Sequence, residues 1–583
     1  MPLRPANTRR PRTGRILAGV ATAGGVVLVV TTVMPRGASG GLRGADRAAD
    51  TIVSSIRAEP RSFNRYVARD LTTIVVTYLT QSTLVRVNRV TNQLEPELAQ
   101  SWELLPDRRT FRVRLRPGLR FSDGAPFTAD DVVFSFQAIG DERTASVLAD
   151  NIRVGSKSVA VWAEDAATVA IRFPSAFGPG LRLLDAVPIL PHHLLKPRLD
   201  AGTFRSAWGP STPPAEMAGL GPFVLHRYDP GQRLVFDRNP HHWRWMGEQR
   251  APRVNHVVLE VVPDQEAESL ALDAGAIDFT QSEIRPSDFS GLKRAVDDGR
   301  VTLTDLGIGL DGDLFWINLT AAASKDPRHR WLQHPDFRRA VSHSIDRQAF
   351  VDEVYMGAAV PAYGVISPGN REWYVDAPTP RYDLDAAKRL LASLQLTARD
   401  GAMLQDADGT PVHFSLLTQK GNTSLERGAA VIRESLARVG VRVDVVALDV
   451  GALMQYVGAG KYDAAYFRLL LTDTDPALNT DFWLSSGSAH VWNPSQPAPE
   501  TSWEAEIDGL MNQVLTTLDP ERRRALFADV QRTMAREVPV LCFAFPRLSF
   551  AMSTRIVRAT PAPFRPPVLW NPSAIDVVDG STK

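Results

Sequence analysis

The stretch "AAVIRESLARVGVRVDVVAL", residues 429–448, places a helix directly before a strand. Ile432 and Leu436 recur at helical spacing, and Gly440 is the type of residue that ends a helix. The valine-rich run that follows, 441–448, predicts a strand. Because a helix that leads into a strand is the building unit of an α/β layer, this stretch predicts an α/β fold.

The rest of the second half has the same pattern. Apolar positions from Phe337 to Ile345 follow a helical period, and Asp519-Pro520 is a helix start. That last helix leads into the apolar run "VPVLCFAF", residues 538–545, which predicts another strand. We therefore expect one α/β lobe after about residue 310.

The first half is richer in hairpins. In "RTFRVRLRPGLRFSDG", residues 109–124, large apolar residues alternate with arginines, which predicts a half-buried strand entering a turn. Thr128 and Asp131 then have the spacing of a capping box, which predicts a helix start. The contrast between the two halves therefore predicts two lobes with a cleft between them.

A second stretch, "YDAAYFRLLLTDTDPALNTDFWLSS" at 462–486, begins as a buried strand and ends in acids and aromatics. Counted from Asp473, positions six and twelve are Leu478 and Leu484, where a calcium loop needs glycine and glutamate. The carboxyl end of a strand is where open α/β sheets bind ligands, so a cleft wall is favoured. A solvated acidic loop is the alternative.

Other motifs lack the context that their chemistry needs. "GIGLDG", residues 307–312, runs into a strand instead of the helix of a dinucleotide site, and favours a crossing between lobes. The adjacent pairs His192-His193 and His241-His242 cannot chelate a metal as an i, i+4 pair does. We predict no catalytic residues, no metal site and no cofactor; the protein is not expected to be an enzyme.

Charge and cysteine content limit the class of protein. The first 49 residues carry a net charge of +7 against +1 for the whole chain, so the body is mildly acidic at −6. Such a body argues against nucleic-acid binding. The uncharged run Ile16–Met34 after this basic start predicts an export signal, or an anchor that attaches the protein to the membrane. The single cysteine, Cys542, leaves no lipid-attachment site after that run.

Several quoted segments together resemble one family in the right order, over nearly all of residues 52 to 570. They are "LTQSTLVRVNRVTNQLEPELAQSWELLPDRRTFRVRLRPGLRFSDGAPFTADDVVFSF", "GPFVLHRYDPGQRLVFDRNPHHW", "PDFRRAVSHSIDRQAFVDEVYMGAAVPAYG" and "YDLDAAKRLLA". They are similar to extracellular solute-binding proteins of family 5, the peptide, nickel and oligopeptide binders that serve ABC importers.

This resemblance implies an α/β, two-lobed periplasmic-binding-protein-like fold of type II, cluster C, with an extra small domain in the N-terminal half. The implied division, after a leader and linker at 1–50, is a first lobe at 51–86, 219–310 and 546–583, a small domain at 87–218 and a second lobe at 311–545. Lobes of this kind close over a ligand.

In the family's peptide binders, an aspartate four residues before the proline of the "TDTDP" motif takes the ligand's amino group. The matching position here, counted from Pro476, is Thr472, with Asp473 beside it. The strand residues Arg468 to Leu470 resemble the edge that pairs with a peptide backbone. The expected ligand contacts are Glu59, Tyr78, Trp316, Asn318, Trp373, Tyr374, Arg468, Thr472, Asp473 and Trp483.

The sequence thus predicts an exported, monomeric binding component of an ABC importer. It would capture a peptide or another small polar solute in the periplasm or at the outer face of the cytoplasmic membrane, and would dock on ABC permease subunits. A membrane-anchored ligand sensor or chaperone-like receptor on the same fold is the alternative.

Overall fold

The computed structural model describes residues 50–149, 152–154, 157–285, 288–398, 403–469 and 473–578. All of them lie in the second of two compact units, Leu42–Lys583. The predicted leader, Ile16–Met34, and the predicted contact Thr472 lie outside the described residues.

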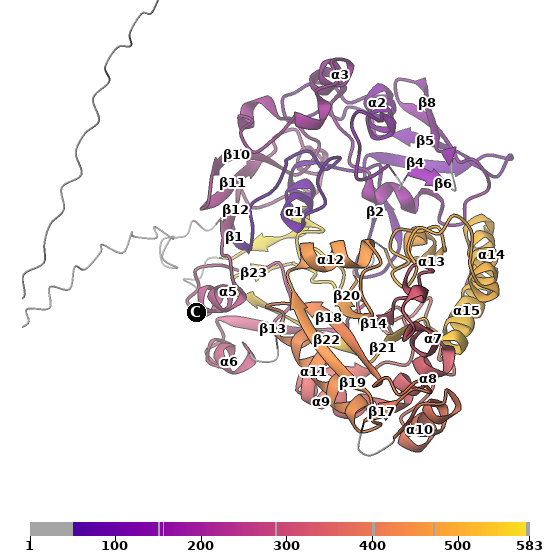
Figure 1. Cartoon of the computed structure of the whole chain (residues 1–583). Coiled ribbons are helices and arrows are strands. Elements are labelled where there is room, and N and C mark those ends of the chain that lie inside the picture. Colours follow the sequence, from indigo (N-terminus) through magenta and orange to yellow (C-terminus); the bar gives the residue numbers. More distant parts are fainter. Residues whose placement is uncertain are drawn as a thin grey trace, which may run out of the picture. The chain divides into compact units, whose positions relative to one another are not determined.

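Two four-stranded sheets lie in the first half of the chain (Figure 1). One sheet has the order β1-β12-β11-β10 and the other β4-β5-β9-β8. Their strands are β1 (Thr51–Ile56), β4 (Ala99–Leu104), β5 (Thr110–Leu115), β8 (Ala160–Asp165), β9 (Thr168–Arg172), β10 (Phe223–Asp229), β11 (Arg233–Arg238) and β12 (His256–Val261). In the first sheet only the β1–β12 pair is parallel, and the second sheet is antiparallel throughout.

The second half is built on a five-stranded sheet of order β19-β18-β20-β14-β21. Its strands are β14 (Asp313–Ile317), β18 (His413–Gln419), β19 (Arg442–Leu448), β20 (Ala464–Arg468) and β21 (Val540–Cys542). A separate three-stranded sheet has the order β13-β22-β15. It contains β13 (Val301–Ile308), β15 (Ala359–Pro361) and β22 (Ala544–Ser553).

The helices are distributed over both halves (Figure 1). They are α1 (Leu71–Thr80), α2 (Ala129–Gly140), α3 (His192–Asp200), α4 (Trp243–Met246), α5 (Gln265–Asp273), α6 (Phe289–Asp297), α7 (His329–Leu332), α8 (Pro335–Ser344), α9 (Arg347–Tyr355), α10 (Leu384–Ser393), α11 (Thr423–Ala437), α12 (Val450–Gly458), α13 (Thr480–Trp483), α14 (Ser502–Thr516) and α15 (Pro520–Glu537). The short strands are β2 (Val85–Val87), β3 (Leu94–Pro96), β6 (Arg153–Val154), β7 (Lys157–Ser158), β16 (Thr397–Ala398), β17 (Leu404–Gln405), β23 (Ile556–Val557) and β24 (Asp576–Val577).

The local predictions are confirmed where the sequence period is strong. The helix and strand of 429–448 are α11 and β19, and the capping box at Thr128 and Asp131 starts α2. The Asp519-Pro520 helix is α15, whose cap is the Asp519 side chain. The glycine-rich segment 307–312 joins β13 to β14, as the predicted crossing requires.

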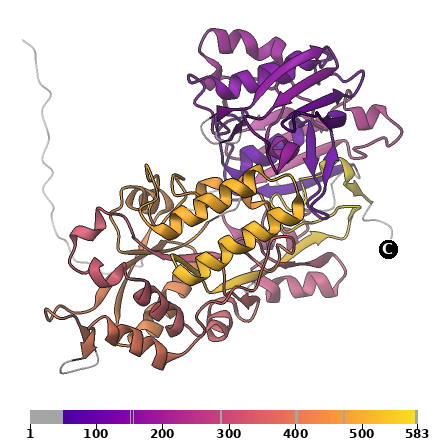
Figure 2. The ribbon, with the colours of Figure 1, turned by 90° about the vertical axis from the view of Figure 1, so that its right-hand side faces the viewer.

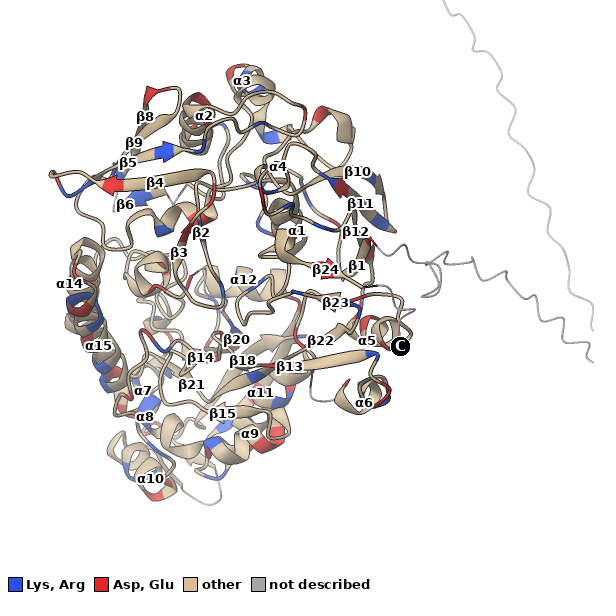
Figure 3. Cartoon of the chain, turned by 180° about the vertical axis from the view of Figure 1, so that it is seen from behind, with Lys and Arg blue, Asp and Glu red and all other residues tan. Residues whose placement is uncertain are grey.

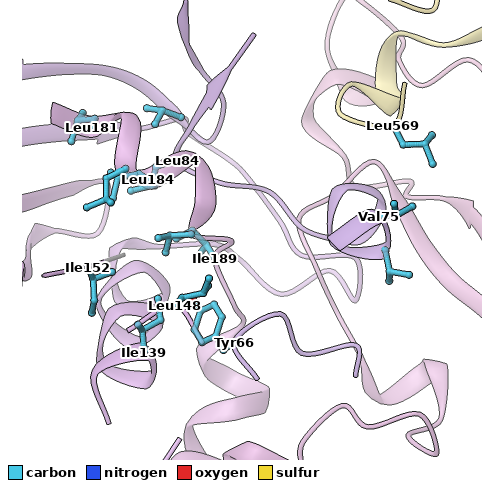
Figure 4. Packing of buried hydrophobic residues seen from close by; sticks show 14 of the residues in the cluster. Tyr66, Val75, Leu84, Ile139, Leu148, Ile152, Leu181, Leu184, Ile189 and Leu569 are labelled. Atoms are coloured by element: carbon cyan, nitrogen blue, oxygen red, sulfur yellow. The ribbon is translucent and has the colours of Figure 1, made fainter. Parts of the chain in front are cut away.

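Buried side chains form a large cluster that reaches across both halves, a second cluster around the five-stranded sheet and a third beside β1 and β12. In the first cluster, Leu181 and Leu184 pack near Leu84, with Tyr66 and Leu148 close by (Figure 4). Helices α14 and α15 run side by side (Figure 2). The division into two lobes and a small domain stays a prediction, and we keep its names for those segments.

Two helical glycines test how closely α11 packs on β20. A Cβ on Gly428 would lie 2.6 Å from the Tyr466 ring, whereas one on the exposed Gly509 of α14 would meet nothing within 4 Å. We expect Gly428→Ala to lower the free energy of unfolding by about 1–3 kcal/mol, because the fully buried ring has no room to move.

Gly509→Ala is the matched control and should raise that free energy by about 0.5–1 kcal/mol through helix propensity alone. Urea unfolding followed by circular dichroism measures both changes. Equal stabilisation by the two substitutions would contradict the close packing of α11 on Tyr466.

Candidate functional site

The end of β20 is fixed by a buried ion pair. Asp313, the first residue of β14, pairs in register with Arg468, the last residue of β20. Arg468 donates to Asp313 from Nε at 2.6 Å and from Nη2 at 3.2 Å, and the Tyr355 hydroxyl donates to the same carboxylate. Burial alone would lower the pKa of Arg468, but Asp313 raises it well above its usual value, so the guanidinium stays charged.

A pocket opens beside this ion pair, where the chain crosses between the halves. We call it the crossing pocket; the space within it that admits a water-sized sphere is about 20 Å³. It is lined by Glu283, Leu306, Gly309, Leu310, Asp311, Arg468, Pro546, Leu548, Phe550, Ala562, Pro563, Arg565 and Pro567. Most of the lining residues are apolar, but the exposed wall is mainly polar because two arginines and two carboxylates are set into it.

Glu283 of the crossing pocket is loosely paired with its arginines. Nη2 of Arg565 lies 3.2 Å from both Glu283 oxygens, and Nη1 of Arg468 lies 3.9 Å from Oε1 of Glu283. Burial raises the pKa of Glu283, but Arg565 and Arg468 together lower it by more, so the carboxylate is ionised. The distances to Glu283 exceed the 2.7–2.9 Å typical of a tight guanidinium–carboxylate hydrogen bond, so another polar group can compete for Arg565, whereas Arg468 stays bound to Asp313 at 2.6 Å.

A second charged group lies where the loop after β20 meets the small domain. Asp473 accepts from Nε of Arg182 at 2.7 Å and from the Asp475 backbone N–H at 2.8 Å. Arg182 also donates to the Thr474 hydroxyl at 2.8 Å and to the Asn92 side chain at 2.7 Å. Asp473 and Arg182 are 8% and 12% exposed, so water screens this pair weakly.

Tyr78 and Arg89 extend this second group. Nη2 of Arg89 donates to the Tyr78 hydroxyl and to Asp185, both at 2.7 Å, and Arg89 also lies within electrostatic reach of Asp473. Burial lowers the pKa of Arg89, but Asp185, Tyr78 and Asp473 raise it more strongly, which keeps the guanidinium charged. Phe564 covers the guanidinium at 4.7 Å, and its neighbour Arg565 lines the crossing pocket. The two charged groups are thus joined through segment 562–567.

Behind the loop, Asp475 forms a bidentate pair with Arg523 of α15 at 2.8 and 2.9 Å. Trp373 and Trp483 both pack edge-on against Phe527 of the same helix. Both indoles are buried, at 4% and 2% exposure. The structure therefore uses these two tryptophans to support the loop from behind.

Of the predicted contacts, Arg468 lies in the crossing pocket, and Tyr78 and Asp473 meet in the second charged group. Trp373 and Trp483 lie behind the loop, and the exposed Tyr374 follows Trp373.

Three other predicted contacts lie elsewhere. Glu59 is exposed and accepts from the Tyr228 hydroxyl and the Gly231 N–H. Asn318 is fully buried and donates to the carbonyls of residues 460 and 462, at the end of β14 opposite Asp313, roughly 16 Å along the strand. Trp316 is 1% exposed, and its N–H donates to Tyr462 at 3.1 Å.

Sequence reasoning missed Arg182, Arg89, Glu283 and Arg565. Each is a charged residue whose partner of opposite charge is far away in the chain: Arg182 and Asp473 are 291 residues apart, and Arg89 and Asp185 are 96 residues apart. The available signal was weak: a charged residue within an otherwise apolar run, as Arg182 is in "GLRLL".

A third set of polar residues, Asp326, His329 and Asp463, has ligand atoms close enough to hold a cation. Arg328 already bridges both carboxylates, at 2.7 Å from Asp326 and 3.1 Å from Asp463. The guanidinium supplies the positive charge that the acids need, so we assign this cluster to packing at the amino end of β20. Within the described part of the chain, no helix is both long and apolar enough to cross a membrane.

A mixed α/β body with a pocket of mixed polarity where the chain passes between its halves is suited to binding a solute. The chain belongs to the bacterial extracellular solute-binding proteins, family 5, whose model matches residues 93–490. This membership confirms the expected fold class and the prediction that the protein is not an enzyme.

Relatives with known names or structures cover most of the chain. A probable ABC transporter-binding protein of Deinococcus radiodurans is 25% identical over 82% of this chain and 84% of that protein. The oligopeptide-binding protein AppA of Bacillus subtilis, solved with a nonapeptide, is 22% identical over 91% of this chain and 99% of that one, with a TM-score of 0.72. NikZ of Campylobacter jejuni, solved with Ni(L-His), is 19% identical over 91% and 100%, with a TM-score of 0.74.

The Asp475–Arg523 pair predicts a large loss of stability on truncation. Arg523 and Asp475 are 7% and 8% exposed, so Arg523→Gln leaves a buried carboxylate without its cation. We expect the free energy of unfolding to fall by about 3–5 kcal/mol.

Arg532→Gln on the same helix is the matched control, since Arg532 and Asp529 are 59% and 52% exposed. Its effect should stay below about 1 kcal/mol. Thermal and urea unfolding measure the free energy of unfolding of both variants. Equal losses would show that Arg523 does not stabilise the buried Asp475 carboxylate.

Proposed function

We propose that this protein is the solute-capturing component of an ABC importer and that it binds a peptide or another small polar solute by closing its lobes outside the cytoplasmic membrane. Family membership supports the binding role, and the Deinococcus relative carries the name of a transporter component. The export signal or anchor at Ile16–Met34 and the docking on permease subunits are parts of this proposal.

The observation that carries the proposal is the position of the crossing pocket. It lies where β20 ends and where the segment between β13 and β14 passes from one half to the other, so lobe closure changes its walls. Leu310, Leu548 and Phe550 offer apolar contact, and Glu283, Arg468 and Arg565 offer charged groups. Such a lining suits a solute with both apolar and charged parts.

The fold by itself leaves the solute open, because the solved neighbours hold ligands as different as a nonapeptide and a nickel–histidine complex. The described body carries mixed charge: Lys and Arg are interspersed with Asp and Glu over its elements (Figure 3). We propose that orientation of the solute comes from Arg565, because its carboxylate partner Glu283 holds it only loosely, whereas Asp313 holds Arg468 at 2.6 Å.

Native mass spectrometry of the full chain, purified without denaturation, tests the proposal directly. We expect a retained solute whose mass and fragments identify it: a peptide series marks an oligopeptide binder, and a single non-peptide mass marks another solute. A protein that retains no solute and acquires none from peptide and sugar libraries contradicts the proposal.

The identified solute then tests the crossing pocket. Arg565→Gln should weaken its binding at least about tenfold in calorimetry, because a hydrogen bond to a charged group contributes on the order of 1.5–3 kcal/mol. Arg558→Gln in the same C-terminal segment is the control, since Arg558 is 62% exposed and 4.0 Å from its acid. Equal affinities for wild type and Arg565→Gln would exclude Arg565 from the site.

A further inference from the structure

Arg182 extends from a rigid base into the junction between the small domain and the second lobe. It belongs to a short 3₁₀ helix, Gly180–Ala186, whose Leu181 and Leu184 are buried in the core (Figure 4). These two buried leucines hold the helix backbone against the core, and with it the backbone of Arg182. The planar guanidinium of Arg182 can then donate several directed hydrogen bonds at once.

The Arg182 guanidinium donates hydrogen bonds to residues of two parts of the chain. Nε donates to Asp473, and Nη2 donates to Thr474, both in the second lobe. Nη1 and Nη2 donate to the Asn92 carbonyl and side chain, at 3.0 and 2.7 Å, in the small domain. Asn92 itself accepts from the Thr474 hydroxyl at 2.8 Å and donates to Glu372 at 2.9 Å. Arg182 is therefore the centre of a polar junction that links the two parts.

We propose that Arg182 is a built-in latch: its guanidinium takes the Asp473 carboxylate as an internal counter-ion and holds the small domain on the second lobe without a ligand. The inference rests on the proposed function, since a latch matters only if the lobes move. Charge-assisted hydrogen bonds are the strong ones, and this pair is nearly dry, so the closed arrangement gains stability from it.

The latch also affects which solutes the cleft accepts. A cationic group of a solute that approaches Asp473 must compete with a guanidinium already bound at 2.7 Å. A solute gains more at the crossing pocket, where the arginine–glutamate spacings are 3.2 and 3.9 Å. The Asp473 carboxylate is thus already bound by the protein's own guanidinium.

An ion pair inside the second lobe separates the latch from a general loss of stability. Arg328 donates to Asp463 at 3.1 Å, and these two residues are 21% and 14% exposed. Both residues belong to the second lobe, so loss of Arg328 should lower stability without releasing the small domain. Loss of Arg182 should release the small domain.

Single-molecule energy transfer on the ligand-free full chain tests the latch. Fluorophores are placed at Leu104→Cys in β4 and Lys388→Cys in α10, two exposed positions on the two sides of the junction. Cys542 does not need to be replaced, because burial raises the pKa of its thiol to about 12 and it is 2% exposed. Circular dichroism verifies that each variant is folded.

We expect the labelled wild type to show one population. Arg182→Gln and Asp473→Asn should each add a second population of lower efficiency, with at least about a tenfold rise in the equilibrium constant for opening. The double variant should open no more than either single one, because both substitutions remove the same pair. Arg328→Gln should leave the distribution unchanged.

Identical distributions for wild type, Arg182→Gln and Asp473→Asn would overturn the latch. The same opening in Arg328→Gln would also overturn it, because a general loss of stability would then explain the release. Both results leave the proposed function untouched, since that function depends on whether native mass spectrometry finds a solute.

Discussion

The Asp313–Arg468 pair is the interaction on which the rest of the site depends. Asp313 is 1% exposed, and a carboxylate at that depth is costly unless a cation is bound to it. Arg468 supplies that cation only when β20 and β14 pair in their observed register, because a shift by one residue would turn its side chain to the other face of the sheet. This constraint fixes where β20 ends, and with it the start of the loop that carries Asp473 and Asp475.

Several helices and strands were predictable because their signals are local. The helix and strand of 429–448 follow from spacing within twenty residues, and the α2 start follows from Thr128 and Asp131, three residues apart. Each signal depends on a helical period or on a cap that the neighbouring backbone satisfies. The reading of 307–312 as no nucleotide site was predictable for the same reason, since a glycine-rich segment between two strands cannot start the helix that such a site needs.

The site was less predictable because its contacts join segments far apart in the chain. A sequence shows that Arg182 and Glu283 are charged, but their partners are chosen by the packing of separate sheets. Asn318 is an example of a residue that lies close to the site in sequence but not in space. It follows segment 307–312 closely, yet it lies at the end of β14 opposite Arg468, where its side-chain amide donates to two backbone carbonyls. Tyr78 and Asp473 were predicted as separate contacts, and only Arg89 brings them into one group.

The two charged groups differ in how completely their acids are paired, and this difference bears on specificity. Asp473 has an arginine at 2.7 Å and a backbone N–H at 2.8 Å, so an incoming cation gains little there after it displaces both. Glu283 has its nearest arginine nitrogen at 3.2 Å, so a solute can take arginine hydrogen bonds there without breaking a tight pair. Specificity in a binding protein is a difference between affinities, and an acid that is already neutralised contributes to it by rejecting ligands. If the crossing pocket holds the solute as proposed, a change of the residue at position 182 would therefore alter the ligand range of this protein without any change in that pocket.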